Sequence, residues 1–287
     1  MAARSVYPQR EGDAASEPLF LRRLSRFAAL GPAQKDGLCA VLSRPMRFAT
    51  HGDLMVEGVS STAGYVIDQG WACSYKLLRD GKRQILGFVL PGDHVTETDL
   101  QSGGPGCSVA ALTPVVVRPC HASGLAQLRE RHGQVRQALD ATRQLEMAML
   151  RDHLVNIGRR NAYQRLAHLI LELYWRLRIV GLADGNSFGL PITQEMIADA
   201  LGLSNVHVNR TLRRLVDDGI ACHSGDRLAI LDRRALADIA EFEESYLGQF
   251  LREKGYVREN AVSAPRRWPD GRAAGSGAWL ANAGDLS

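Results

Sequence analysis

The chain has 287 residues, a length that suggests about two domains at ~100–200 residues per domain. Hydrophobic residues make up 45% and charged residues 23%, which is ordinary for a soluble globular protein. The net charge of +4 permits nucleic-acid binding without arguing for it, so the location of the positive charges matters more than their sum.

The cysteines exclude several kinds of metal site. There are five of them, widely spaced and without a CxxC pair, so neither a zinc ribbon nor a thioredoxin-like site is indicated. No cysteine cluster near the N-terminus could hold an iron–sulfur centre. The N-terminus has no apolar signal region, and no stretch of about 18 apolar residues occurs. We therefore expect a cytoplasmic protein with reduced thiols, no metal, no cofactor and no contact with a membrane.

The first half of the chain changes from a helical to a strand-like pattern. Residues 1–16 are polar and rich in small side chains, which is typical of a disordered tail. Residues 17–42 fit one or two short amphipathic helices, broken at Gly31-Pro32. From 44 to 118, short apolar runs alternate with turns, and Asp80-Gly81 is a strong hairpin signal. This spacing predicts an antiparallel barrel or jelly roll.

A long helix is predicted over residues 134–157, followed by a second helix over 161–180. The long helix is apolar on two faces and must bury both. One face can lie on the β domain. The other can meet the same helix of a second subunit, as in a coiled coil, or be buried inside one monomer. The two faces carry, respectively, Val135, Ala138, Thr142, Leu145 and Met149, and Leu139, Met147, Leu150, Leu154 and Ile157.

Residues 191–231 predict a helix-turn-helix with a short β wing. Thr193 can cap the first helix, Gly202 breaks it, and Ser204 can cap the second. A helix, a glycine-containing turn and a second helix form the geometry that lays the second helix in a major groove of DNA. Gly225-Asp226 then separates two short strand-like runs as a tight hairpin, which would be the wing.

DNA recognition needs side chains near the start of the second helix that can reach base edges. Arg210 is the best candidate for a bidentate contact with guanine, and Asn205 or Asn209 could pair with adenine. The remaining arginines of this helix are better placed for phosphates. A solvated helix face is the alternative for any single arginine, but the ordered set of cap, glycine turn, helix and wing favours DNA binding. The predicted DNA-binding residues are Ser204, Asn205, Val206, His207, Asn209, Arg210, Arg213 and Arg214.

The stretch ITQEMIADALGLSNVHVNRTLRRLVDDGI resembles the winged helix-turn-helix signature of the CRP/FNR superfamily of bacterial regulators. The stretch GWACSYKLLRDGKRQILGFVLPGDHV is similar to the central strands of that superfamily's cyclic-nucleotide-binding-like β-roll. The likeness covers about residues 17–247. It implies a homodimer joined by the long helix, a palindromic promoter site in double-stranded DNA, and an effector state of the β-roll that repositions the DNA-binding domains. It leaves contact with RNA polymerase open.

The sensor part departs from the cyclic-nucleotide-binding members. In those members a glutamate after the PGD-type turn holds the ribose, and an arginine before Ser-Ala pairs with the phosphate. Glu97 sits where that glutamate would be, but Cys107, just before Ser108, stands at the arginine position. A thiol cannot neutralise a phosphate diester as a guanidinium does. We therefore predict an effector pocket at Glu97, Cys107 and Ser108 that does not take cyclic AMP.

The recognition helix departs from the family as well. Many members place a glutamate two residues after the capping residue, where it accepts from a cytosine amino group. Val206 occupies that position here, and Asn209 takes the place of a small residue. Arg210 matches the family's base-reading arginine. The half-site should keep the guanine contact and lose the cytosine preference, and Val206 could touch a thymine methyl group instead.

We therefore expect an α+β fold with an N-terminal antiparallel β-roll (jelly roll), a long dimerisation helix and a C-terminal winged helix-turn-helix. The expected parts are a disordered tail at 1–16, a sensor domain at 17–132, the dimerisation helix at 133–160, the DNA-binding domain at 161–247 and a disordered tail at 248–287.

Other classes of function compete with this interpretation. A metal-dependent cupin-like enzyme needs clustered histidine and glutamate ligands, and haem needs an axial histidine or cysteine. Redox sensing through Cys107 or Cys120 is a further hypothesis within the regulator class, although a buried, unreactive cysteine is the commoner case. The candidate ligands are scattered along the chain without an HxH pair: His51, His94, Glu97 and His121.

Overall fold

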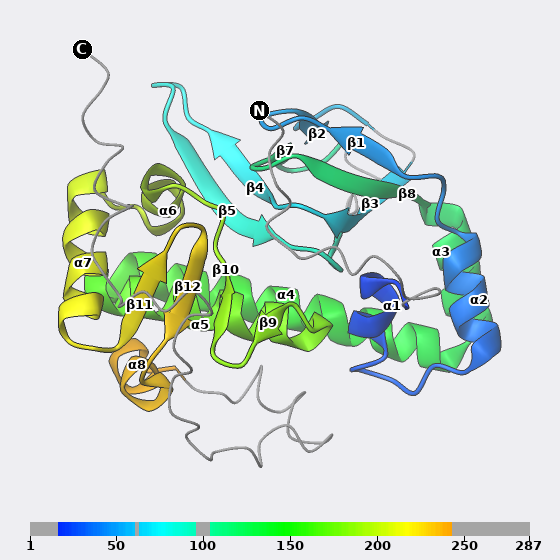
Figure 1. The fold of residues 1–287 in the computed structure, drawn as a ribbon. Helices are drawn as coiled ribbons and strands as arrows, with labels where there is room; N and C mark the ends of the chain where they lie inside the picture. The colour runs from blue at the N-terminus through cyan, green and yellow to red at the C-terminus, as the bar shows by residue number, and fades with distance from the viewer. Residues whose placement is uncertain (1–16, 61–62, 96–103, 243–287) are drawn as a thin grey trace.

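The computed structural model describes residues 17–60, 63–95 and 104–242, which form a β-roll, a long helix and a C-terminal helical domain (Figure 1). This arrangement confirms the α+β fold expected from the sequence. The tails expected at 1–16 and 248–287 lie outside the described residues, as does the end of the expected 161–247 domain. None of the described helices is long and apolar enough to cross a membrane.

The β-roll is built from two four-stranded antiparallel sheets, with strand orders β1-β8-β3-β6 and β2-β7-β4-β5. Apolar side chains from both sheets, among them Ile67, Val109 and Val117, form the core between them. The strands are β1 (Met46–Phe48), β2 (Asp53–Met55), β3 (Ala63–Gln69), β4 (Ala72–Leu77), β5 (Arg83–Val89), β6 (His94–Val95), β7 (Ser108–Ala111) and β8 (Val115–His121).

The hairpin of β4 and β5 connects the roll to the C-terminal domain. Its turn contains the predicted Asp80-Gly81 signal, and Gly81 has a φ of 84°, a left-handed conformation that glycine adopts without strain. On β5, Arg83 pairs with Asp199 at 2.7 Å and Gln84 donates to the carbonyl of Ala200 at 3.3 Å. Both partners lie on α6 (Gln194–Leu201), so the roll contacts the first helix of the helix-turn-helix directly.

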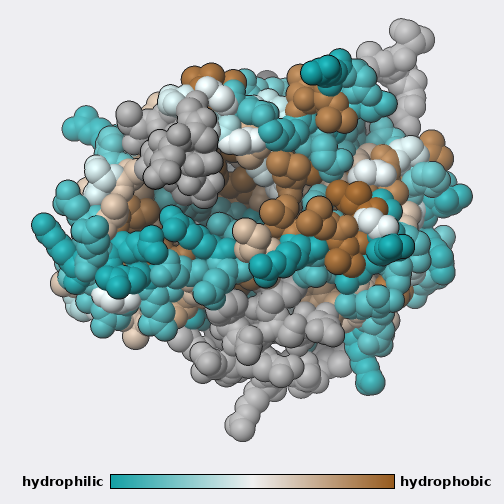
Figure 2. Space-filling model, turned by 180° about the vertical axis from the view of Figure 1, so that it is seen from behind, coloured by the Kyte–Doolittle hydropathy of each residue, from teal (hydrophilic) through white to brown (hydrophobic). Residues whose placement is uncertain are grey.

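Within this chain, the long helix α4 (Gly133–Arg159) buries the first of the two apolar faces that the sequence predicts. Side chains of the first face, from Val135 to Leu145, are buried, whereas most of the second face is open. Figure 2 views the molecule from behind and shows hydrophobic side chains gathered on that side. The exposed apolar side chains of α4 are Met147 (49% exposed), Leu150 (44%), Leu154 (65%) and Val155 (45%).

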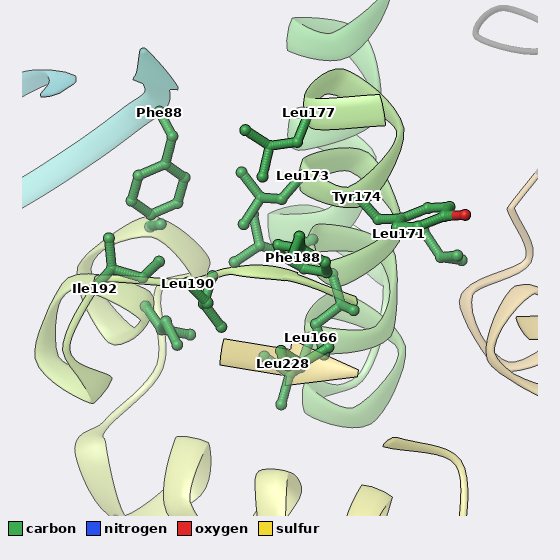
Figure 3. Close-up of a cluster of buried hydrophobic side chains, with 14 of the residues drawn as sticks. Phe88, Leu166, Leu171, Leu173, Tyr174, Leu177, Phe188, Leu190, Ile192 and Leu228 are labelled. Carbon is green, nitrogen blue, oxygen red and sulfur yellow. The ribbon is translucent and has the colours of Figure 1, made fainter. Parts of the chain in front are cut away.

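Helix α5 (Ala162–Val180) is the centre of the largest hydrophobic core. Asn161 caps it in a capping box with Gln164, and Gly181 ends it in the left-handed conformation. Leu173 and Leu177 of α5, Phe88 of β5 and Ile192 of the C-terminal domain belong to one cluster of buried side chains (Figure 3). The roll and the C-terminal domain therefore share one core. The other helices before it are α1 (Leu19–Leu24), α2 (Pro32–Ala40) and α3 (Ala122–Arg131).

A buried ion cluster joins α1, the turn before β6, and α5. The Asp93 carboxylate lies 2.5 Å from Arg23 Nη1 and 2.6 Å from Arg176 Nη2, and it accepts from the amide of Leu90 at 2.8 Å. Arg176 also donates to the carbonyl of Phe88 at 2.7 Å. Burial raises the pKa of Asp93, but the two arginines outweigh burial, so its pKa lies below the ordinary value.

Helix α1 and the residues just after it also contact the carboxyl end of α5. Arg22 donates to the carbonyl of Val180 at 3.0 Å, and Arg26 donates to that of Ile179 at 3.2 Å. These bonds satisfy carbonyls that a helix end leaves without a helical partner. The turn at Gly92 packs closely against α1 and the end of α5. A Cβ at Gly92 would lie 3.1 Å from the carbonyl oxygen of Leu19 and 3.0 Å from a methyl of Val180. Gly92 also has a φ of 91°.

Replacing Asp93 with alanine should lower the free energy of unfolding by about 3–5 kcal/mol, because the buried Arg23 would lose its carboxylate partner and the buried Arg176 would keep only Glu172. Urea denaturation at neutral pH measures this change. Asp80→Ala, in the exposed hairpin turn, is the control and should leave the midpoint nearly unchanged. If Asp93→Ala lowered the free energy of unfolding no more than Asp80→Ala, the ion cluster would contribute little to stability.

The same cluster predicts a pH dependence. Because the folded-state pKa of Asp93 is lowered, its stabilisation is fully present above the ordinary value of 3.8 and is lost as the pH falls through the folded value.

Candidate DNA interface

The helix-turn-helix consists of α6 and α7 (Asn205–Asp217), and local signals set its ends. The Thr193 hydroxyl accepts from the amide of Met196 at 3.2 Å, and Gly202 ends α6 with a φ of 62°. The Ser204 hydroxyl accepts from the amide of His207 at 3.3 Å and so caps α7. Both caps are those that the sequence predicts.

One face of α7 is buried and the opposite face is open. Val208 and Leu215 are 0% and 1% exposed and pack in the large core, whereas Val206 is 75% exposed. All eight predicted DNA-binding residues lie on α7 or at its cap, and all except the partly buried Asn209 are exposed. The structure thus brings together, on one helix, the side chains that the sequence singled out.

The arginines of α7 differ in how firmly they are held. The Arg214 guanidinium lies 4.2 Å from the centre of the Tyr163 ring and 3.5 Å from Asp218. The Tyr163 hydroxyl donates to Asp218 at 2.6 Å, and burial together with this carboxylate raises the pKa of Tyr163 to about 12. Within the described residues, neither Arg210 nor Arg213 makes an ion pair. Arg214 is therefore fixed on α5, while the other two are open to solvent.

The wing is part of a larger sheet than the sequence predicts. Strands β11 (Ala221–Ser224) and β12 (Arg227–Ile230) form the expected hairpin, with Gly225 in the left-handed region at a φ of 61°. Two further strands, β9 (Ala183–Asp184) and β10 (Ser187–Gly189), extend it in the order β11-β12-β10-β9. These strands were missed, although Asp184-Gly185 is a turn signal of the same kind as Asp80-Gly81. Helix α8 (Arg233–Ala240) follows the wing.

The predicted effector residues are only partly within the described chain, since Glu97 lies outside it. The Ser108 hydroxyl accepts from the amide of Glu57 at 3.0 Å, and Glu57 forms an ion pair with Lys76. Burial raises the pKa of the half-buried Cys107 thiol, and the charge of Lys76 opposes this. Lys76 is the cation that sequence reasoning missed, because strand pairing rather than sequence proximity places it near β7.

The candidate redox and metal residues lie apart from one another. Burial raises the pKa of Cys120 to about 11 and lowers that of His94 to about 4. His51 and His121 are exposed. Among residues 17–60, 63–95 and 104–242, no three His, Cys, Asp or Glu side chains form a group that could hold a metal ion.

Known families match both halves of the chain. Residues 45–132 match the cyclic nucleotide-binding domain, and residues 164–239 match the Crp-like helix-turn-helix domain. The nitrogen fixation regulation protein FixK of Bradyrhizobium diazoefficiens is 31% identical over 192 residues, covering 67% of this chain and 79% of that protein. The transcriptional activatory protein AadR of Rhodopseudomonas palustris is 28% identical, covering 77% of this chain and 90% of that protein.

A solved structure agrees with these matches. FixK2 from Bradyrhizobium japonicum has 30% sequence identity and a TM-score of 0.61, covering 69% of this chain and 97% of that chain. The fold and the exposed recognition helix define a regulator with a helix-turn-helix DNA-binding domain and a sensor-type β-roll. The chain belongs to the CRP/FNR superfamily of transcription regulators, as its sequence motifs indicate. The cupin-like enzyme is set aside, because the relatives are regulators.

Arg213 and Arg214 should differ when each is replaced by alanine. Arg213→Ala should weaken binding to all DNA sequences alike and reduce the slope of log affinity against log salt by about one, as expected for one lost phosphate contact. Arg214→Ala should instead lower the melting temperature, because it removes the stack on Tyr163. Binding titrations at several salt concentrations and thermal melts measure both effects. Equal salt slopes for the two variants would contradict this division.

Proposed function

We propose that this regulator is a dimer that binds a two-fold symmetric DNA site with one α7 in the major groove of each half-site. The open face of α7, with Val206 and Arg210 near its capped start, is the single observation that carries the proposal. Recognition helices of this motif read bases with residues near their N-terminus, and paired half-sites then lie about one helical turn apart.

Arg210 and Val206 are solvent-exposed on α7 and can reach base edges. Arg210 can place its guanidinium against O6 and N7 of guanine, the commonest specific contact in the major groove. Val206 presents only methyl groups, so it suits the C5 methyl of thymine and offers no acceptor to a cytosine amino group. The half-site should therefore contain a guanine and lack the cytosine preference that a glutamate would impose.

The open face of α4 supports the dimer. Met147, Leu150 and Leu154 follow a three-four spacing on that face, the pattern of a coiled-coil seam. Apolar side chains with exposed fractions up to 65% on one helix are costly in water, and a second copy of α4 would cover them. The buried face of the same helix fixes its orientation on the roll.

The sensor would respond to a ligand other than cyclic AMP. Cys107 cannot supply the charge that a phosphate diester needs. Lys76 is the nearby cation that opposes the pKa shift of Cys107, and it is already engaged by Glu57. A cyclic nucleotide would have to break that ion pair to gain a phosphate partner.

Selection of DNA from a random pool by the purified full-length protein tests the proposal. The expected product is a two-fold symmetric site whose half-sites are about one helical turn apart. Selection with no enrichment of any sequence over the starting pool at physiological salt would exclude sequence-specific binding.

Arg210→Ala should remove the guanine preference at one position of each half-site and weaken binding to the selected site, at a cost of about 1–3 kcal/mol. Competition between the selected site and a version with that base pair changed measures the preference. Arg213→Ala is the matched control, since it should weaken both sites equally. An unchanged preference in Arg210→Ala would exclude the base-reading role.

Leu154→Glu should convert the dimer to a monomer, because it places a carboxylate in the apolar seam. Sedimentation velocity measures the change, and binding to the full site should fall more than binding to an isolated half-site. Leu78→Glu is the control, because Leu78 is also exposed (53%) but lies in the β4–β5 turn. If both variants sediment like the wild type, α4 does not form the interface.

A further inference from the structure

A hydrogen bond joins the recognition helix to the start of the first helix of the motif. The Asn209 Nδ2 amide on α7 donates to Gln194 Oε1 at 3.2 Å. Gln194 is the first residue of α6, held in place by the Thr193 cap just before it. Both side chains are partly buried, and Asn209 is the one predicted base reader that is not exposed.

This bond leaves free the atoms that an asparagine uses to read adenine. An asparagine amide has two N–H donors and one carbonyl acceptor. Reading adenine takes the carbonyl, which accepts from N6, and one N–H, which donates to N7. Gln194 takes one N–H of Asn209, and within the described residues Oδ1 of Asn209 has no protein partner. One N–H donor and the carbonyl acceptor of Asn209 therefore remain available for adenine.

The bond is made with one particular orientation of the Asn209 amide. The two orientations of an amide differ by an exchange of donor and acceptor, and only one fits adenine. With Gln194 Oε1 as the acceptor, the Asn209 amide turns its Nδ2 toward α6. The Gln194 Nε2 donor remains available to a DNA phosphate, which would fix the pair in the complex. Asn205, in contrast, is exposed at the first position of α7.

We propose that Asn209 reads an adenine in each half-site and that Gln194 is its positioning residue. This inference rests on the proposed DNA-binding function and assigns to Asn209, rather than Asn205, the adenine contact. Specificity at this base pair then depends on two helices of the motif, whereas the guanine contact of Arg210 depends on α7 alone.

The test measures base preference with the full-length protein. A pair of DNA duplexes carries the selected site with and without a change at the adenine, and competition gives the affinity ratio. Asn209→Ala should reduce this ratio by about ten- to a hundredfold, the range of a lost bidentate contact. Gln194→Met keeps the length but lacks the acceptor, so it should reduce the ratio at the same base pair. Gln194→Glu keeps an acceptor oxygen and should retain the ratio, even if its charge weakens binding to both duplexes.

Two controls separate positioning from a general structural effect. The guanine preference due to Arg210 should be unchanged in every Gln194 and Asn209 variant, and Asn205→Ala should leave the adenine ratio unchanged. The double variant Gln194→Met with Asn209→Ala should reduce the adenine affinity ratio no more than Asn209→Ala does alone.

Several outcomes would contradict the roles proposed for Asn209 and Gln194. An unchanged adenine ratio in Gln194→Met would exclude the positioning role, and an unchanged ratio in Asn209→Ala would exclude the reading role. Loss of the ratio in Asn205→Ala would assign the contact to the other asparagine. If the wild-type protein selected no DNA site at all, the proposed function itself would fail. If it selected a site but the variants left the adenine ratio unchanged, only the roles of Asn209 and Gln194 would fail.

Discussion

The carboxylate of Asp93, shared between Arg23 and Arg176, is the interaction on which the arrangement of the molecule depends. A carboxylate in the protein interior is tolerated only with such partners. Arg23 in turn depends on Asp93, whereas Arg176 also pairs with Glu172. The three side chains come from α1, from the turn that precedes β6, and from α5. Because α5 runs through the core of the C-terminal domain, one buried charge fixes the β-roll relative to the recognition helix.

The recognition helix could be predicted in detail because its signals are local. Thr193, Gly202 and Ser204 set helix ends through hydrogen bonds to residues no more than four positions away, and the alternation of buried and exposed residues on α7 follows from helical periodicity. The ion cluster could not be predicted, since its members are separated by as many as 153 positions in the sequence and meet only after folding. The two extra strands of the wing sheet were missed because runs of two and three residues carry too little pattern.

The candidate site shows the same division between local and long-range information. Once the helix is predicted, the sequence alone indicates that Arg210 is exposed to solvent and that Val206 offers no polar group. That Arg214 is stacked on Tyr163, and that Asn209 is bonded to Gln194, depends on how α7 packs on α5 and α6. The roll contacts the same motif through Arg83 and Asp199, so α6 contacts both the β-roll and α7.

The bonds from α1 to the end of α5 bring together two helices that are far apart in the sequence. Residues 19–24 precede the β-roll, yet Arg22 bonds the end of a helix that lies 158 positions further along the chain. A chimera that exchanged the C-terminal part for that of a relative, cut at the α4–α5 junction, would place a foreign helix end against this α1. Such hybrids should fold well only when α1 and α5 come from the same parent, because these two helices pack together although the β-roll and α4 lie between them in the sequence.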